Sequence, residues 1–362
     1  MINNQILQSS IEEWSAISKA KLGVYDLQGN PLALTGDAIP ASTICSFLES
    51  EAASQVIGEC HLMKVLEDEE PIYVLSALGS GEDDTYTIAK MAVSSLRVIS
   101  KAYKERVDKD NFYQNLILDN MLLVDVYNRA RKLRIENVQN RLVFLIETNG
   151  GEDNIARDLL KGMYTPQSGD AVTSVDENTI ILIKSMREKY TAEDTDAIAN
   201  TIVSTLNTEA MLRVKVAYGS VVGELKDVSK SFKEAKVALE VGKIFYAHRS
   251  VISYATLGIG RLIYQLPQSL CEIFIDETFG GDVPDLDEET LSTLDKFFEN
   301  NLNVSETARQ LFVHRNTLMY RIEKIQKSTG LDLRSFDDAL TFKIALMVQS
   351  YLEYLESQGG NY

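Results

Sequence analysis

The residues best suited to chemistry lie together near the C-terminal end of the chain, between Arg309 and Lys327. This segment holds five Lys or Arg residues and one acidic residue, a local net charge of +4, whereas the whole chain of 362 residues carries −17. Arg can bridge the O6 and N7 atoms of guanine, Asn can bridge the N6 and N7 atoms of adenine, and Thr and Tyr suit phosphate oxygens. The segment therefore predicts contact with a polyanion, because an island of positive charge attracts phosphates within about one Debye length. A solvated basic helix face is the simpler alternative.

The apolar residues around this segment are spaced as in two short helices separated by a tight turn. Asn303 or Ser305 can cap the first helix, and the second is expected over residues 316–326. The residues expected to face inward are Val304, Ala308 and Leu311 in the first helix and Leu318, Ile322 and Ile325 in the second. The polar face of the second helix would carry Arg315, Asn316, Thr317, Tyr320, Arg321 and Lys324. Two helices joined by a turn of three or four residues form a helix-turn-helix, whose second helix enters the major groove of DNA.

Residues 304–348 carry a recognisable motif set. They read VSETARQLFVHRNTLMYRIEKIQKSTGLDLRSFDDALTFKIALMV, which resembles the C-terminal helix-turn-helix of the PucR/CdaR class of bacterial transcription regulators. In that class an HRNT motif, a Tyr-Arg pair, a Thr-Gly-Leu-Asp turn and a closing helix recur. The resemblance implies contact with double-stranded DNA by His314, Arg315, Asn316, Thr317, Tyr320 and Arg321, and the charge pattern adds Lys324.

Composition excludes several other classes of protein. The chain is 45% hydrophobic and 25% charged, as in ordinary globular proteins, and its net charge of −17 argues against affinity of the whole surface for anionic membranes. Three scattered cysteines, Cys45, Cys60 and Cys271, form no disulfide framework. The N-terminal residues lack the pattern of a signal peptide, and no run of 18 apolar residues occurs, so we expect a cytoplasmic protein without a membrane partner.

Residues upstream of the helix-turn-helix predict an α+β protein of several domains. Residues 138–255 alternate strands and helices, and RVKVAYGSVVGELKDVSKSFKEAKVALEVGK resembles part of the GGDEF-derived domain that such regulators often carry. Residues 91–137 predict a helical connector with an amphipathic stripe, which either packs on its own domain or dimerises. Residues 256–362 would form the all-α DNA-binding domain, and residues 1–90 a small α+β sensor.

The hairpin that carries the chemistry of active diguanylate cyclases is degenerate in this chain. In those enzymes a Gly-Gly-Asp/Glu-Glu-Phe hairpin lets the backbone approach the nucleotide and places carboxylates on magnesium. Here the corresponding residues 174–178 read SVDEN, which retains Asp176 and Glu177 but neither glycine nor the aromatic residue. Glu147 loosely matches another metal position of that family. The bulkier Ser174 and Val175 should obstruct the backbone, so we expect a scaffold without cyclase activity.

The N-terminal residues are similar in pattern to the PAS-like sensor segments of CdaR-type regulators of sugar diacids. Apolar residues alternate on both sides of a Gln-Gly-Asn-Pro turn at residues 28–31, which predicts a hairpin, and a second strand pair follows. Gln55, Cys60, His61 and Lys64 form the candidate ligand-binding cluster, because Lys and His can pair with an anionic ligand. Ordinary packing of the Cys-His pair is the alternative. Neither zinc-ligand spacing nor a nucleotide-binding fingerprint appears, so no metal or cofactor is expected.

These patterns together predict a ligand-responsive regulator of a catabolic operon, not an enzyme, that binds a double-stranded DNA operator as a homodimer. The expected effector is a small molecule, with a small carboxylate or sugar acid as the candidate class. Two alternatives stay open. The first is a nucleotide-binding sensor or cyclase-like enzyme that uses Asp176 and Glu177 of the middle domain. The second is an interaction protein whose basic helices contact another protein.

Overall fold

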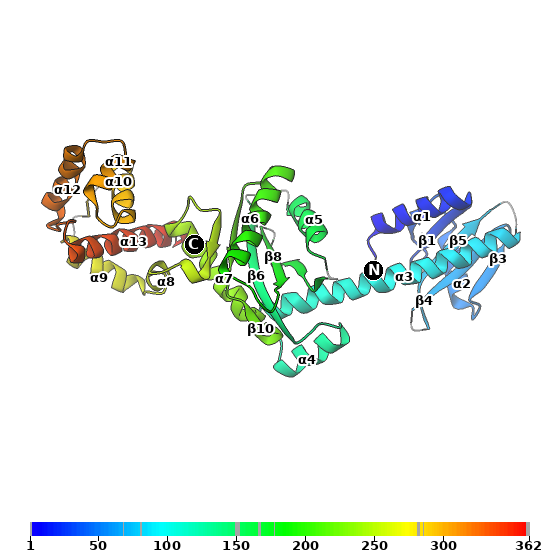
Figure 1. The fold of residues 1–362 in the computed structure, drawn as a ribbon. Helices are drawn as coiled ribbons and strands as arrows, with labels where there is room; N and C mark the ends of the chain where they lie inside the picture. The colour runs from blue at the N-terminus through cyan, green and yellow to red at the C-terminus, as the bar shows by residue number, and fades with distance from the viewer. Residues whose placement is uncertain are drawn as a thin grey trace. The chain divides into compact units, whose positions relative to one another are not determined.

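The computed structural model describes residues 2–67, 69–79, 82–148, 153–165, 168–176, 178–280, 283–284 and 286–359. The chain divides into two compact units, an N-terminal unit, Met1–Phe112, and a C-terminal unit, Tyr113–Tyr362 (Figure 1). Strands and helices alternate through the first part of the chain, and helices alone follow β11. The α+β prediction is therefore confirmed. Within the described residues, no helix is both long enough and apolar enough to cross a lipid bilayer.

The N-terminal unit is an antiparallel sheet with helices on both faces. Its five strands are β1 (Lys21–Tyr25), β2 (Pro31–Leu34), β3 (Ser54–Ile57), β4 (Cys60–Glu67) and β5 (Glu70–Leu78), in the spatial order β2-β1-β5-β4-β3. The helices are α1 (Asn4–Ser18), α2 (Ala41–Glu49) and the long α3 (Glu82–Ile117), whose residues from Tyr113 onward belong to the C-terminal unit. The predicted hairpin at residues 28–31 is confirmed: it joins β1 to β2, and Gly29 has a φ of 85°, which glycine adopts without strain.

Side-chain alternation along the strands separates two apolar layers in this unit. Leu7 and Ile11 of α1 pack with Leu96 of α3 over one face of the sheet. Ile44 and Phe47 of α2 cover the other face. The first four turns of α3 are thus held by their own domain, the first of the two arrangements considered for this helix.

The first part of the C-terminal unit is a second sheet. Its strands are β6 (Val138–Thr148), β7 (Ala171–Ser174), β8 (Thr179–Ser185), β9 (Val214–Tyr218), β10 (Val222–Glu224) and β11 (Val251–Ser253). Their order is β11-β9-β6-β8-β7, with β10 also paired to β6, and only the β9–β11 pair among them is parallel. The helices of this part are α4 (Leu123–Lys132), α5 (Asp153–Met163), α6 (Ala192–Glu209) and α7 (Val228–Phe245). Helices α5 and α6 pack in one core with the sheet, whereas α7 contacts β6 and β9.

The contact between β9 and α7 is too close for any side chain at Gly219. A Cβ atom built there would lie 2.1 Å from the backbone oxygen of Ser231. We expect Gly219→Ala to lower the free energy of unfolding by about 1–3 kcal/mol or more, because backbone cannot yield as a side chain can. Gly223→Ala is the matched control, since its Cβ would meet only Asn140 Oδ1 at 3.7 Å. Calorimetric unfolding of both variants tests this, and equal melting temperatures would refute the close contact.

The chain ends in a helical domain made of α8 (Gly260–Ile263), α9 (Gln268–Phe279), α10 (Glu288–Glu299), α11 (Val304–Gln310), α12 (Arg315–Thr329) and α13 (Phe336–Gly359) (Figure 1). Two apolar clusters meet on α13. Phe342 packs with Leu294 of α10 and Leu318 of α12, whereas Val348 packs with Ile275 of α9. Helix α13 therefore braces the α10–α12 group and connects it to α8 and α9.

Candidate nucleic-acid interface

Helices α11 and α12 form the predicted helix-turn-helix, joined by residues 311–314. Asn303 is the N-cap of α11, and its Oδ1 accepts hydrogen bonds from the backbone N–H groups of Ser305 and Glu306, each at 3.1 Å. The turn is fixed by a hydrogen bond from Val313 N–H to the Ala308 oxygen at 3.0 Å. Of the two caps considered from the sequence, Asn303 is confirmed. The turn of four residues agrees with the predicted length.

The first turn of α12 carries exposed side chains and is positively polarised. His314 is its N-cap, and His314 Nδ1 accepts a hydrogen bond from the Asn316 N–H at 3.2 Å. Arg315, Asn316 and Thr317 follow with exposed side chains, and no acidic residue lies in this turn. A helix start of this kind favours anions, because the N-terminal end of the helix dipole is positive. Recognition helices of helix-turn-helix proteins contact base edges through these N-terminal residues.

The two faces of α12 separate as the apolar spacing predicts. Leu318, Ile322 and Ile325 are buried in the core shared with α10 and α13. Tyr320 is 68% exposed on the opposite side, where Lys324 is also exposed. Within the described residues, the side chains of Arg315 and Lys324 have no hydrogen-bond or ion-pair partner. Both cations are therefore available to an outside anion.

Arg321 differs from the other candidate residues because α10 already binds it. Its side chain is only 21% exposed, and its Nη1 donates to Thr293 Oγ1 at 2.7 Å. Its Nη2 forms an ion pair with Glu289. The structure thus places Arg321 as a brace between α10 and α12, whereas the sequence grouped it with the outward residues. Its contact with DNA stays a prediction.

Arg321→Ala is expected to destabilise the α10–α12 contact by about 1–2 kcal/mol, because the buried hydroxyl of Thr293 loses its donor. Hydrogen exchange of α10 and α12 amides in the full-length protein measures this change. Lys324→Ala changes an exposed residue of the same helix that has no hydrogen bond or ion pair among the described residues, and it serves as the control. Equal exchange rates in the two variants would show that Arg321 is not a brace.

The charge of α12 also acts on its neighbour α10. Asp287 is the N-cap of α10, and hydrogen bonds from Thr290 lower the pKa of its carboxyl group. The charges of Lys324 and Arg321 lower that pKa further. The carboxylate therefore stays ionised near the basic residues, although it is exposed.

Sequence reasoning missed one exposed residue in this region. Phe312 in the turn is 96% exposed and has a φ of 55°, a left-handed conformation that is uncommon for a bulky residue. The only signal in the sequence is an aromatic residue between two helices, where a polar turn residue is usual.

The cyclase-like hairpin does not form a metal site among the described residues. Asp176 is exposed, and its Oδ1 accepts a hydrogen bond from Asn178 N–H at 3.0 Å, whereas Glu177 lies outside the described residues. Glu147 Oε1 lies 2.6 Å from Lys243 Nζ. Burial opposes the charge on Lys243, but its hydrogen bonds to Glu147 and Glu240 raise the pKa overall. The ammonium group of Lys243 is therefore paired with the carboxylate of Glu147, which the sequence had loosely matched to a metal position.

The structure places three of the four ligand-binding candidates of the N-terminal unit on one face of the sheet and the fourth, His61, on the other. Cys60 packs with the α2 layer, and Gln55 pairs in register with Leu62 of that same layer. His61 points to the other face, where its ring lies 6.0 Å from that of Tyr86 on α3. Lys64 Nζ donates to the Leu48 oxygen at 3.1 Å and to the Ser50 oxygen, at the end of α2. Alternation along β4 therefore separates His61 from the other three candidates, which share the α2 face of the sheet, and ligand binding by these residues stays a prediction.

Comparison with known families agrees with this geometry. Residues 290–348 match the PucR C-terminal helix-turn-helix domain, and residues 120–241 match the GGDEF-like domain. The predicted resemblance is confirmed: the chain has the domain content of a PucR/CdaR-type transcription regulator.

Individual relatives are regulators as well. The chain is 23% identical over 290 residues to the carbohydrate diacid regulator of Escherichia coli. This alignment covers 72% of this chain and 70% of that protein. It is 29% identical over 144 residues to the purine catabolism regulatory protein of Bacillus subtilis, covering 39% of this chain and 27% of that protein. It is 23% identical over 273 residues to the proline-responsive transcriptional activator PutR of Bacillus subtilis, covering 70% of this chain and 65% of that protein. The alignments thus leave a third or more of PutR and most of the purine regulator unmatched.

Proposed function

We propose that this protein is a cytoplasmic regulator that binds operator DNA through α12 and controls a catabolic operon in response to a small molecule. One observation supports it most: a helix with an exposed first turn, Arg315 to Thr317, and with cations that have no hydrogen-bond or ion-pair partner among the described residues, lies inside a matched helix-turn-helix. The relatives include a carbohydrate diacid regulator, a purine catabolism regulatory protein and a proline-responsive activator, and these support the catabolic context.

Residues 1–90 are proposed as a PAS-like sensor, 91–137 as the connector, 138–255 as a GGDEF-like scaffold and 256–362 as the DNA-binding domain. The order of elements supports the first assignment, because the resemblance implies a strand-turn-strand start, a helical middle and a closing hairpin that leads into a long helix, and β1–β2, α2, β4–β5 and α3 follow that order. The effector class remains a small carboxylate or sugar acid, in line with the sugar diacid relative.

A homodimer is proposed because one recognition helix makes few phosphate contacts, whereas two helices one duplex turn apart bind together. Met91 and Val98, seven residues apart on α3, are each 67% exposed and lie on the side away from its own core. A spacing of seven residues is the repeat of helices that pair in coiled coils.

Genomic fragments captured by the full-length protein and then sequenced test the proposed function. We expect enrichment of a small set of sites by the wild type, and loss of that enrichment with Arg315→Ala and with Lys324→Ala. The Lys230→Ala variant changes an exposed lysine of α7 that is far along the chain from α12, and it should capture the same fragments as the wild type. If all four proteins captured the same fragments equally, α12 would not be the DNA-binding element.

A further inference from the structure

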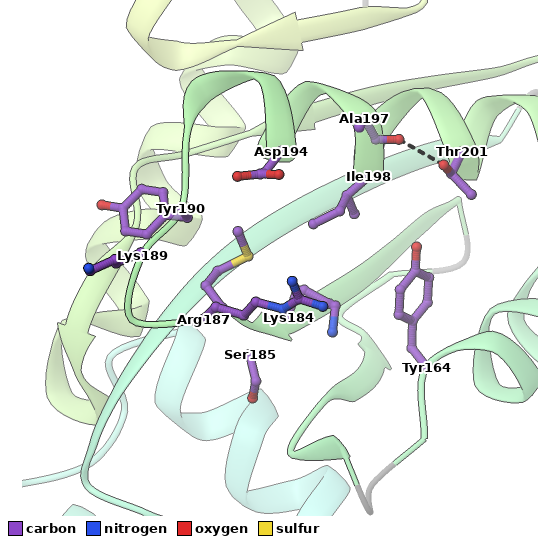
Figure 2. Close-up of a pocket in the computed structure, with 11 residues that line it drawn as sticks. Tyr164, Lys184, Ser185, Arg187, Lys189, Tyr190, Asp194, Ala197, Ile198 and Thr201 are labelled. Carbon is purple, nitrogen blue, oxygen red and sulfur yellow. Dashed lines mark hydrogen bonds between the residues drawn. The ribbon is translucent and has the colours of Figure 1, made fainter.

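A pocket lies in the GGDEF-like domain at the end of β8 opposite the β7–β8 hairpin. Its volume is about 470 Å³, and it is bounded by the end of β8, the loop at residues 186–191, the first half of α6 and Tyr164 (Figure 2). Sites for small molecules usually have volumes of about 300–1,000 Å³. The pocket shares no residue with the degenerate cyclase hairpin.

Positive charge dominates the polar lining of this pocket. Lys184, Arg187 and Lys189 line it against a single carboxylate, Asp194. Lys184 is already paired, with its Nζ 2.9 Å from Asp170 Oδ2. The side chains of Arg187 and Lys189 are exposed and have no hydrogen-bond or ion-pair partner in the part of the chain that the structure describes. Two cations are thus left free in a chain whose net charge is −17.

Asp194 does not neutralise these cations fully, because it is engaged in capping α6. Its Oδ2 accepts hydrogen bonds from Thr191 N–H at 2.8 Å and from Thr191 Oγ1 at 2.9 Å, as part of a capping box. Those bonds lower the pKa of the Asp194 carboxyl group, and the charge of Arg187 adds to the effect. The carboxylate is therefore ionised, and it leaves an excess of one positive charge from Arg187 and Lys189.

The remaining walls are apolar or aromatic. Met186 lines the pocket and is buried. Ile198 lies between Asp194 and Tyr164 in the view of Figure 2. Tyr190 stands at the side where Lys189 lies. An apolar floor with a few convergent charged groups is the usual composition of a site for a small organic anion.

We propose that this pocket binds a small organic anion. Arg187 and Lys189 hold its carboxylate or phosphate group, and Ile198 and Tyr164 contact its body. The interpretation of this pocket as an effector site rests on the proposed regulatory function. Under this proposal the ligand binds in the GGDEF-like domain rather than at the N-terminal cluster predicted from the sequence. Because Arg187 and Lys189 belong to the loop that connects β8 to α6, an anion bound there would link these two elements.

The test is calorimetric titration of the full-length protein with four probes: succinate, the sugar diacid glucarate, inorganic phosphate and adenosine monophosphate. Succinamide, which keeps the shape of succinate without its charge, is the ligand control. The variants are Arg187→Gln/Lys189→Gln and Ala197→Trp, whose ring would fill the pocket from an exposed position of α6. Arg213→Gln/Lys236→Gln removes the same two charge types from exposed positions outside the pocket.

We expect at least one anionic probe to bind the wild type and the Arg213/Lys236 control, whereas succinamide does not. Affinity for that probe should fall about tenfold or more in both pocket variants. The Arg187/Lys189 variant loses charged hydrogen bonds, each of which contributes strongly, and the Ala197→Trp variant loses the space for the ligand. Binding confined to succinate and glucarate identifies a carboxylate, and binding confined to the other two identifies a phosphate. Binding that is equal in all variants, or no binding by any probe, overturns the proposal. DNA capture by the same wild-type preparation shows separately whether the proposed function holds.

Discussion

Replacing Arg315 by alanine is expected to weaken binding to the captured operator by about 10- to 100-fold. The exposed guanidinium at the start of α12 has no partner within the described chain, so its only expected role is with DNA. A bidentate Arg–guanine contact contributes about 1–3 kcal/mol of discrimination. Fluorescence anisotropy with a labelled operator at fixed salt measures the change.

The same variant should fold as the wild type does, because the Arg315 side chain is exposed and makes no hydrogen bond or ion pair within the described residues. Its melting temperature is therefore the internal control, and Lys230→Ala is the control for loss of one charge. Affinity that stayed within twofold of the wild type would exclude Arg315 from the interface. A lowered melting temperature would instead point to a structural role.

Leu318→Ala has the largest expected effect on stability. Leu318 is completely buried where α10, α12 and α13 meet, and truncation of such a residue costs about 2–5 kcal/mol. Loss of this anchor should also abolish DNA binding, since α12 would no longer be held against α11. Hydrogen exchange of α12 amides reports the local change, which suits a chain of two compact units better than a single unfolding midpoint.

Tyr320→Ala provides the matched comparison for this experiment. It lies two residues away on the same helix and is 68% exposed, so its effect on stability should stay within about 0.5 kcal/mol. Its effect on DNA affinity should nevertheless be measurable. Equal loss of exchange protection in both variants would contradict the assignment of the two faces of α12.

Local patterns predicted the helix-turn-helix well because its information is local. The apolar spacing of Leu318, Ile322 and Ile325 set the buried face, and Asn303 was one of two expected caps. The role of Arg321 could not be read in the same way. Its partners Glu289 and Thr293 lie 32 and 28 residues away on another helix, and only tertiary packing brings them together.

The grouping of His61 with Cys60 in the N-terminal cluster differs from the structure for another reason. Cys60 and His61 are adjacent on one strand, so alternation alone places them on opposite faces, and the sequence already held that information. Lys243 pairs with Glu147 across 96 positions, a contact that has no local signature. The pocket beside Arg187 and Lys189 was missed for the same reason, because β8, α6 and Tyr164 form it jointly.

The central claim is that α12 reads DNA, and the salt dependence of operator affinity tests it most directly. Dissociation constants for the captured operator and for a shuffled sequence should be measured between about 50 and 200 mM salt, with wild type and Arg315→Ala. The wild type should prefer the operator, and its affinity should fall steeply as salt rises, whereas Arg315→Ala should lose most of the preference and show a shallower slope. Affinity that is independent of salt, or equal for the two sequences, would contradict the assignment of α12 as a DNA-reading helix.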